Sequence, residues 1–170
     1  MAGLTIRAER PGDHRPIAEV TTAAFGRDLE ARMIDAIRDS DGYVPELSLV
    51  AVEHSTVVGH AILSYVGLER GPDRLLELGP LAVAPEHQRR GVGTALVREA
   101  LARADRRQEP LVLVLGHPAY YPRFGFRPAA ETFGVTTHYQ APPEVWMALP
   151  LPAYEPHIRG AFRYAPAFGD

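Results

Sequence analysis

The chain has 170 residues, a formal net charge of −3, 46% hydrophobic and 23% charged residues, which is an ordinary globular composition with enough apolar residues for a core. It has no cysteine and no lysine, so disulfides, thiolate metal sites, a cysteine nucleophile and a Walker A loop are excluded. We expect no metal site, no nucleic-acid binding and no membrane segment, and therefore a cytoplasmic protein with one domain over residues 1–170.

The first part of the chain predicts a strand, two helices and a hairpin. Residues 4–8 are a short apolar strand, and Asp13 is a candidate helix N-cap after a Pro-Gly turn. Apolar residues then recur at helical spacing on both sides of Gly26. Two β-branched runs, residues 47–53 and 57–66, are separated by three polar residues, which is typical of a hairpin.

A strand, a loop and a helix follow. The strand at residues 74–83 contains Gly79-Pro80, which predicts a bulge because proline cannot donate to a sheet. Residues 93–106 have a helical apolar face, and residues 111–115 are a continuous apolar run typical of a strand buried on both faces. A helix between two strands indicates that they run parallel.

The remaining segments are shorter. Residues 70–73 predict a turn, and residues 119–124 predict one helical turn that Gly125 caps. Residues 145–149 and 160–164 have the pattern of two late strands. The expected fold class is α/β with a mixed sheet.

The loop before the helix has the features of an anion site. The first turn of a helix has unpaired backbone N–H groups and the positive end of the macrodipole. Gly91 and Gly93 let a ligand approach the backbone, and Arg89 and Arg90 add positive charge. We therefore predict a phosphate or pyrophosphate site, the alternative being an ordinary turn with solvated arginines. A dinucleotide fingerprint would need glycine where the chain has Leu96.

The residue pattern of this loop resembles the motif of a known family. Residues 88–93, Gln-Arg-Arg-Gly-Val-Gly, fit the pattern Gln/Arg-x-x-Gly-x-Gly/Ala, residues 81–85 resemble the strand end before it, and residues 121–126 resemble a later Tyr-x-x-x-Gly-Phe segment. Together they resemble the GNAT superfamily of N-acetyltransferases over residues 47–128. The segment PAYYPRFGF and the tail RGAFRYAPAFG are similar to a bacterial subgroup of predicted acetyltransferases.

The resemblance implies a sheet of about seven strands flanked by helices, and transfer of an acetyl group from acetyl-CoA to a primary amine. The acceptor would be a small molecule or a peptide that attacks directly in a ternary complex. The junction at residues 25–30 would border the acceptor, and late strands that pair between subunits would give a homodimer. The implied cofactor-binding residues are Leu81, Ala82 and Val83 on the strand and Gln88, Arg89, Arg90, Gly91, Val92, Gly93 and Thr94 in the loop.

Two side chains are candidates for proton transfer. Tyr121 matches the family's general acid, and a phenol with a pKa of about 10 is protonated at neutral pH. Its neighbour Tyr120 would point elsewhere on a helical turn. Glu77 occupies the place of a glutamate that serves as base in some members, and burial would raise its pKa towards the range a base needs. His117 is a weaker candidate for acid or base.

Each assignment has an alternative without a catalytic role. Tyr121 could serve packing alone, and Glu77 could be an exposed strand carboxylate. His60 and Ser64 are interpreted as hydrogen-bonded strand residues. The whole protein could be an acyl-CoA-binding regulatory module without catalysis, or an acyltransferase that uses another acyl group or a hydroxyl acceptor. The sequence does not identify the acceptor or the oligomeric state.

Overall fold

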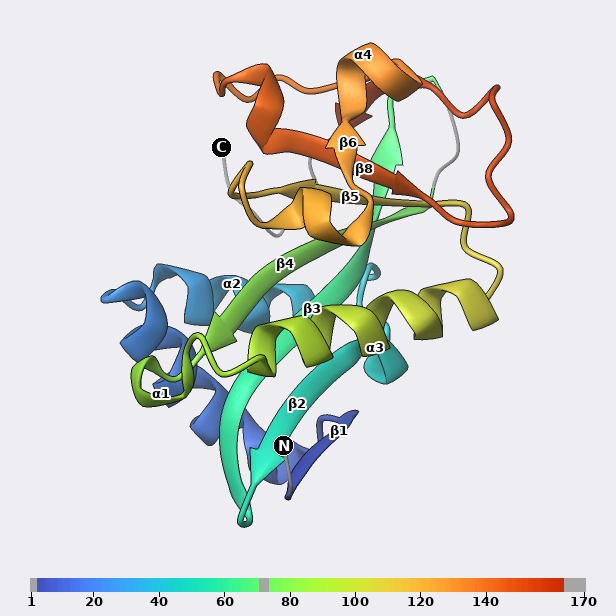
Figure 1. The fold of residues 1–170 in the computed structure, drawn as a ribbon. Helices are drawn as coiled ribbons and strands as arrows, with labels where there is room; N and C mark the ends of the chain where they lie inside the picture. The colour runs from blue at the N-terminus through green and yellow to red at the C-terminus, as the bar shows by residue number, and fades with distance from the viewer. Residues whose placement is uncertain (1–2, 71–73, 164–170) are drawn as a thin grey trace.

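The structure is a computed structural model that describes residues 3–70 and 74–163, and this part of the chain forms one mixed sheet with helices on both faces (Figure 1). The strands of the sheet are β1 Leu4–Ala8, β2 Ser48–Glu53, β3 Thr56–Leu68, β4 Leu75–Val83, β5 Leu111–Leu115, β6 Arg127–Pro128, β7 Val135–Thr136, β8 Trp146–Pro150 and β9 Gly160–Arg163. The helices are α1 His14–Phe25, α2 Leu29–Arg38, α3 Val92–Arg106 and α4 Ala129–Phe133. The predicted mixed α/β sheet is confirmed.

The strand order is β1-β2-β3-β4-β5-β8-β6, with β9 pairing with β3 and β7 pairing with β9. The predicted hairpin β2–β3 is antiparallel, and β3 is also antiparallel to β4. In this second pair the register shifts between Ala61 and Leu63, opposite Gly79-Pro80, so the predicted bulge is present. It lies in the middle of β4 and changes which face of the sheet the following residues occupy.

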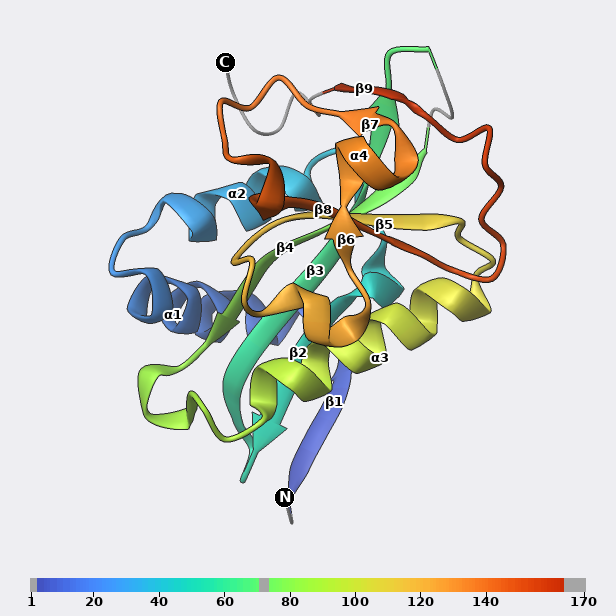
Figure 2. The same cartoon turned by 45° about the horizontal axis from the view of Figure 1, so that its top comes forward.

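The pairing of β4 with β5 is parallel, as predicted, and very short. Only Leu76 with Val112 and Glu77 with Leu113 are in register, after which the two strands diverge (Figures 1 and 2). On its other edge β5 pairs along its whole length with β8 in antiparallel fashion. The sheet therefore opens between its two central strands, at their carboxyl ends.

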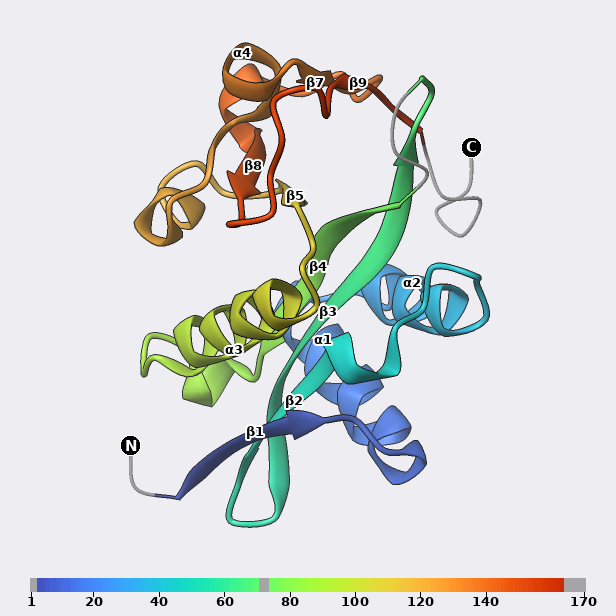
Figure 3. The ribbon, with the colours of Figure 1, turned by 90° about the vertical axis from the view of Figure 1, so that its right-hand side faces the viewer.

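The helices cover opposite faces of the sheet, with α3 on one side and α1 and α2 on the other (Figure 3). On the α3 side, Leu96 and Val97 pack among buried residues that include Val112. On the other side, Ile17 and Ile34 are 1% exposed and pack against β2 and β3. Because each fully buried aliphatic side chain contributes about 1.5–3 kcal/mol, these two apolar layers hold the helices against the sheet.

Some local details differ from the sequence prediction. Asp13 stands at the N-cap position of α1 but makes no side-chain capping bond there. Its carboxylate instead accepts hydrogen bonds from the Arg7 guanidinium at 2.6 and 3.0 Å and from the backbone N–H of Arg10 at 2.7 Å. The elements β6, α4 and β7 were not predicted. Residues 71–73 of the predicted turn and Tyr164 of the last predicted strand lie outside the described residues.

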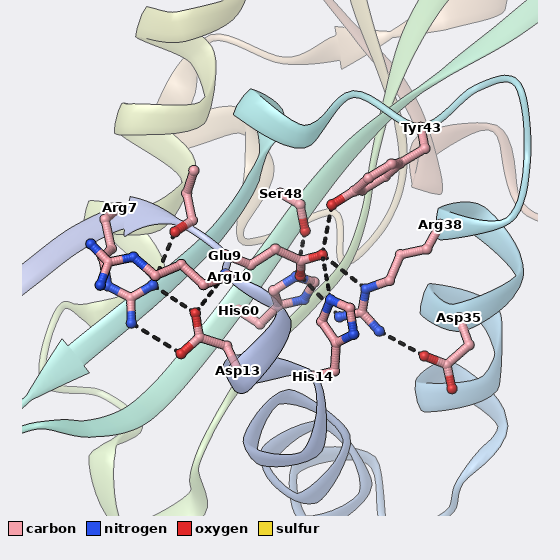
Figure 4. Close-up of polar contacts among 11 residues, drawn as sticks. Arg7, Glu9, Arg10, Asp13, His14, Asp35, Arg38, Tyr43, Ser48 and His60 are labelled. Atoms are coloured by element: carbon pink, nitrogen blue, oxygen red, sulfur yellow. Dashed lines mark hydrogen bonds and ion pairs between the residues drawn. The ribbon is translucent and has the colours of Figure 1, made fainter.

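A buried polar cluster ties the start of α1 to the end of α2 (Figure 4). The Glu9 side chain is 2% exposed, and its carboxylate accepts hydrogen bonds from Arg38 at 2.8 and 2.9 Å and from the Tyr43 hydroxyl at 2.8 Å. The fully buried His60 has its Nε2 atom 3.3 Å from Glu9 and 2.9 Å from the Ser48 hydroxyl. Burial alone would raise the pKa of Glu9, but these hydrogen bonds outweigh it and hold that pKa well below its usual range.

We expect Arg38→Met to lower the free energy of unfolding by about 3 kcal/mol, because it keeps the apolar stem of the side chain and leaves the buried Glu9 carboxylate without its strongest partner. Urea unfolding at pH 7 measures the effect. The matched control is Arg15→Met, which breaks the exposed pair with Glu19 and should leave the midpoint unchanged. Equal midpoints for the two variants would mean that the cluster does not stabilise the helix pair.

Candidate active site

A cavity of about 990 Å³ lies where β4 and β5 diverge. Its walls come from the end of α1 and start of α2, from the second half of β4, from the loop and first turn of α3, and from the segment that follows β5. These regions are distant in sequence, and the opening of the sheet brings them together. Glu77 and Tyr121, the two candidates for proton transfer, both line this cavity.

The loop before α3 has the geometry of an anion site. Arg89 and Gly91 have left-handed backbone, with φ of +59° and +85°. The chain then enters α3, and the first turn of the helix, at Gly93 and Thr94, lines the cavity. The Gln88 side chain donates a hydrogen bond to the Val83 carbonyl at 3.0 Å, which fastens the loop to the end of β4. Because the first N–H groups of a helix have no partner within the helix, those of Gly93 and Thr94 are available to a ligand in the cavity.

The residues predicted to bind the cofactor divide into two groups. Seven of them line the cavity, namely Leu81, Val83, Gln88, Arg89, Gly91, Gly93 and Thr94. The side chains of the other three point away, since Ala82 and Val92 are buried in the two apolar layers and Arg90 lies 3.8 Å from Glu53. For these three a cofactor contact would have to use the backbone, and the binding role of the whole set stays a prediction.

A second contact holds the loop from outside the cavity. His87 has its Nε2 atom 3.2 Å from the carboxylate of Glu53, which lies at the end of β2. Glu53 therefore contacts both His87 and Arg90, and these two contacts hold the loop against the β2–β3 hairpin. Arg89 is thus the loop arginine that faces the cavity.

Tyr121 is packed firmly beside the end of β5. Its ring lies against the backbone of Gly116, where an added Cβ would be 2.2 Å from the ring, and it is 8% exposed. Burial, with a smaller contribution from Tyr120, raises the pKa of the Tyr121 hydroxyl, so this phenol keeps its proton at neutral pH. The short helical turn at residues 121–124 that carries it ends at Gly125 in left-handed conformation, as predicted.

Tyr120 lies at the cavity too, although helical geometry predicted that it would point elsewhere. A Cβ added at Gly93 would be 2.9 Å from the Tyr120 hydroxyl, so this side chain reaches the first turn of α3. The two tyrosine rings are 5.1 Å apart and nearly perpendicular. The helical turn is short and tightly wound, and it presents both hydroxyl-bearing rings to the same space.

Glu77 is buried rather than exposed. The residue is 9% exposed, and its Oε2 atom has no hydrogen-bond partner within the described chain. Burial raises the pKa of this carboxyl to about 7. A carboxyl with this pKa in a cavity is able to take up and release a proton near neutral pH. His117 also lines the cavity, with its Nδ1 atom accepting a hydrogen bond from the Ala119 backbone at 3.2 Å.

The remaining wall lies on the α1–α2 side. Within the predicted junction at residues 25–30, Phe25, Leu29 and Glu30 line the cavity. The lining also includes Met33, Leu115, Arg123 and Tyr139, for which the sequence predicted no role in the site. Met33 and Leu115 belonged to patterns that indicate core packing, and nothing local in the sequence marked Tyr139.

Known proteins of similar sequence are named acetyltransferases. The family model described as the acetyltransferase (GNAT) family matches residues 15–126. An Escherichia coli K12 protein called uncharacterized N-acetyltransferase YjhQ is 36% identical over 167 residues, covering 95% of this chain and 92% of the relative. Another from that strain, uncharacterized N-acetyltransferase YhbS, is 33% identical over 129 residues, which is 75% of this chain and 76% of the relative.

Two solved structures are similar over almost the whole chain. Escherichia coli YhbS in complex with CoA has a TM-score of 0.89 at 26% identity, covering 99% of this chain and 93% of that one. A GNAT-family acetyltransferase from Brucella melitensis in complex with acetyl-CoA has a TM-score of 0.80 at 31% identity, covering 99% of each chain. The fold is thus the one found in GNAT-family acetyltransferases. The chain belongs to the GNAT acetyltransferase family.

None of the helices within residues 3–70 and 74–163 is long and apolar enough to cross a membrane.

Proposed function

We propose that the protein is an N-acetyltransferase that transfers the acetyl group of acetyl-CoA to a primary amine by direct attack in a ternary complex. The observation that carries the proposal is the single cavity that joins the loop at residues 88–94 to both Glu77 and Tyr121. Holding both reactants in one cavity favours direct transfer, because correct positioning contributes on the order of 7–11 kcal/mol to such reactions.

The loop is suited to the phosphates of acetyl-CoA. Two left-handed residues lead into the first turn of α3, where N–H groups have no partner within the helix, and Arg89 adds a positive charge at the cavity. Gly93 has no side chain, and the cavity there is bordered by the Tyr120 hydroxyl. Acetyl-CoA supplies an acyl group activated as a thioester. The relatives of known structure that contain CoA and acetyl-CoA support this assignment.

Glu77 and Tyr121 lie on opposite faces of the opened sheet. Leu76, Leu78 and Tyr121 belong to the apolar layer under α3. Glu77 lies between those two leucines, so alternation along β4 directs it to the other face, where α1 and α2 pack. This arrangement separates the two proton transfers that the reaction needs.

We assign Glu77 as the base and Tyr121 as the acid. As the amine nitrogen bonds to the carbonyl carbon and the carbon–sulfur bond breaks, the amine loses a proton to the Glu77 carboxylate, directly or through water. The departing sulfur gains a proton from the Tyr121 hydroxyl. Both groups can act near neutral pH. Burial raises the pKa of Glu77 to about 7, so it can take up a proton there, and the raised pKa of Tyr121 keeps its proton available for donation.

The first test is thermal unfolding with acetyl-CoA, CoA and ATP. A ligand at about 100 times its Kd adds roughly 2.7 kcal/mol to the free energy of unfolding, so both CoA species should raise Tm by about 5–11 °C for a chain of this length. ATP should have little effect. A folded sample whose Tm rises with neither CoA species would overturn the cofactor assignment and the proposed activity with it.

A further inference from the structure

In the described part of the chain the exposed large apolar side chains are few, and they gather at one place. Within residues 3–70 and 74–163 the large apolar side chains classed as exposed are Phe25 at 42%, Leu29 at 44% and Leu115 at 41%. All three line the cavity, although they come from the end of α1, the start of α2 and the end of β5. Exposed apolar side chains that converge in this way mark a surface that a ligand covers.

These side chains lie on the face of the sheet that Glu77 occupies. Along β5, Leu111 and Leu113 belong to the apolar layer opposite α3, so strand alternation directs Leu115 to that face. Leu113 is also the register partner of Glu77. An amine whose nitrogen approaches Glu77 therefore has its remaining atoms beside Leu115, Phe25 and Leu29.

The wall that α1 and α2 form has no cation among its lining residues. The lining residues from α1 and α2, together with Leu115 and Tyr139, include no arginine or histidine. Their one charged member is Glu30, and the exposed Arg27 already pairs with it at 2.5 and 3.1 Å. The carboxylate of Glu30 is thus neutralised from outside the cavity.

The two arginines that line the cavity come from other segments. Arg89 belongs to the loop before α3. Arg123 lies over the Tyr120 ring at 4.5 Å and donates a hydrogen bond to the Tyr120 carbonyl at 2.9 Å. Both therefore lie on the side that faces the first turn of α3.

We propose that the acceptor is a primary amine carried on an uncharged, apolar body with no carboxylate beside the nitrogen, an inference that rests on the proposed acetyl transfer. A free α-amino acid would place its carboxylate against the wall that Phe25, Leu29 and Leu115 form, and this wall has no arginine or histidine to receive it. A polyamine would press a second ammonium group against Phe25, Leu29 and Leu115. An apolar body instead covers these side chains and removes them from water.

The test measures free thiol release at saturating acetyl-CoA with 2-phenylethylamine, L-phenylalanine and spermidine. L-Phenylalanine adds a carboxylate to the structure of 2-phenylethylamine. Spermidine has further amines in place of the ring. We expect kcat/KM for 2-phenylethylamine to exceed both others by at least about tenfold, as is usual when a pocket must leave a charge unpaired. Equal or faster turnover of phenylalanine or spermidine would overturn the acceptor class while leaving acetyl transfer intact.

The two proposals fail in different ways. If acetyl-CoA raises Tm but none of the three amines releases thiol, acetyl transfer to such amines is wrong. The acceptor site is then decided by adding 2-phenylethylamine to the CoA complex and measuring Tm. A further rise in Tm would support an apolar amine site, and no rise would overturn it. A peptide amide with N-terminal phenylalanine, compared with 2-phenylethylamine in the same assay, distinguishes a peptide acceptor from a small-molecule acceptor.

A charge introduced at Leu115 tests the location of the site. Leu115→Arg supplies the missing cation, so the preference for 2-phenylethylamine over phenylalanine should fall by about tenfold or more. Leu115→Met, a volume-conserving apolar change, should keep the wild-type preference. An unchanged preference in Leu115→Arg, in protein that acetyl-CoA still stabilises, would overturn the assignment. Leu29→Arg provides the same test from α2 if the first variant does not fold.

Discussion

Tyr121→Phe should lower kcat by about 10²-fold or more while acetyl-CoA still raises Tm as in the wild type, because a positioned general acid contributes about 10²–10⁴-fold. The change removes only the hydroxyl group, so the ring keeps its place against Gly116 and its edge-on contact with Phe126 at 5.6 Å. Thiol release with a reactive amine gives kcat, and thermal unfolding with acetyl-CoA checks the cofactor site. A regulatory module without catalysis would have no turnover to lose.

The adjacent tyrosine is the matched control for this variant. Tyr120→Phe also removes one hydroxyl from the same helical turn, but that hydroxyl lies by Gly93 at the start of α3. We expect this variant to weaken acetyl-CoA binding more than it lowers kcat at saturation. If Tyr120→Phe loses the turnover and Tyr121→Phe keeps it, the general acid is Tyr120.

The second large effect concerns Glu77, for which we expect Glu77→Gln to lower kcat by about 10²-fold or more. In the wild type kcat should rise with pH through about 7, because the base acts only when ionised and burial raises the pKa of Glu77 to about 7. In Glu77→Gln this rise should disappear. Glu99→Gln on α3, where Glu99 pairs with Arg103 at 2.7 Å, is the control and should keep the wild-type profile. An unchanged inflection in Glu77→Gln would assign the base elsewhere, with His117 the first alternative.

The stability of the same variant gives a readout that does not depend on activity. Because the pKa of Glu77 lies above its ordinary value of 4.5, the unfolded chain loses this proton at a lower pH than the folded protein does. The wild type should therefore lose stability as the pH rises from about 4.5 to 7, by on the order of 3 kcal/mol. Glutamine does not titrate, so Glu77→Gln should become more stable relative to the wild type across this range in urea unfolding.

Much of the fold could be predicted because its signals are local. The apolar spacing of residues 93–106 and the unbroken apolar run at residues 111–115 each lie within one segment, and the structure has a helix and a strand there. The bulge at Gly79-Pro80 follows from the chemistry of proline itself. The short elements β6 and β7 were missed, because a strand of two residues contains no periodicity and forms only when a partner strand is already in place.

The candidate site was only partly predictable from the sequence, and for the same reason. The loop at residues 88–94 was identified because a glycine pattern before a helix is contiguous in the chain. The burial of Glu77 could not be decided from the sequence, because it depends on how α1 and α2 pack over the sheet. Only packing could decide that its carboxylate would have no hydrogen-bond partner within the described chain.

The sequence by itself determined the order of the longer elements, the predicted anion site at residues 88–94 and the family, because each of these depends on the spacing of neighbouring residues. The tertiary structure alone decided which side chains share the cavity. Phe25, Leu29 and Leu115 come from separate elements, and they meet because β4 and β5 part after two register pairs. Glu9 and Arg38 likewise meet across 29 positions in the chain. Contacts of this kind depend on how strands diverge and helices pack, and no local pattern encodes them.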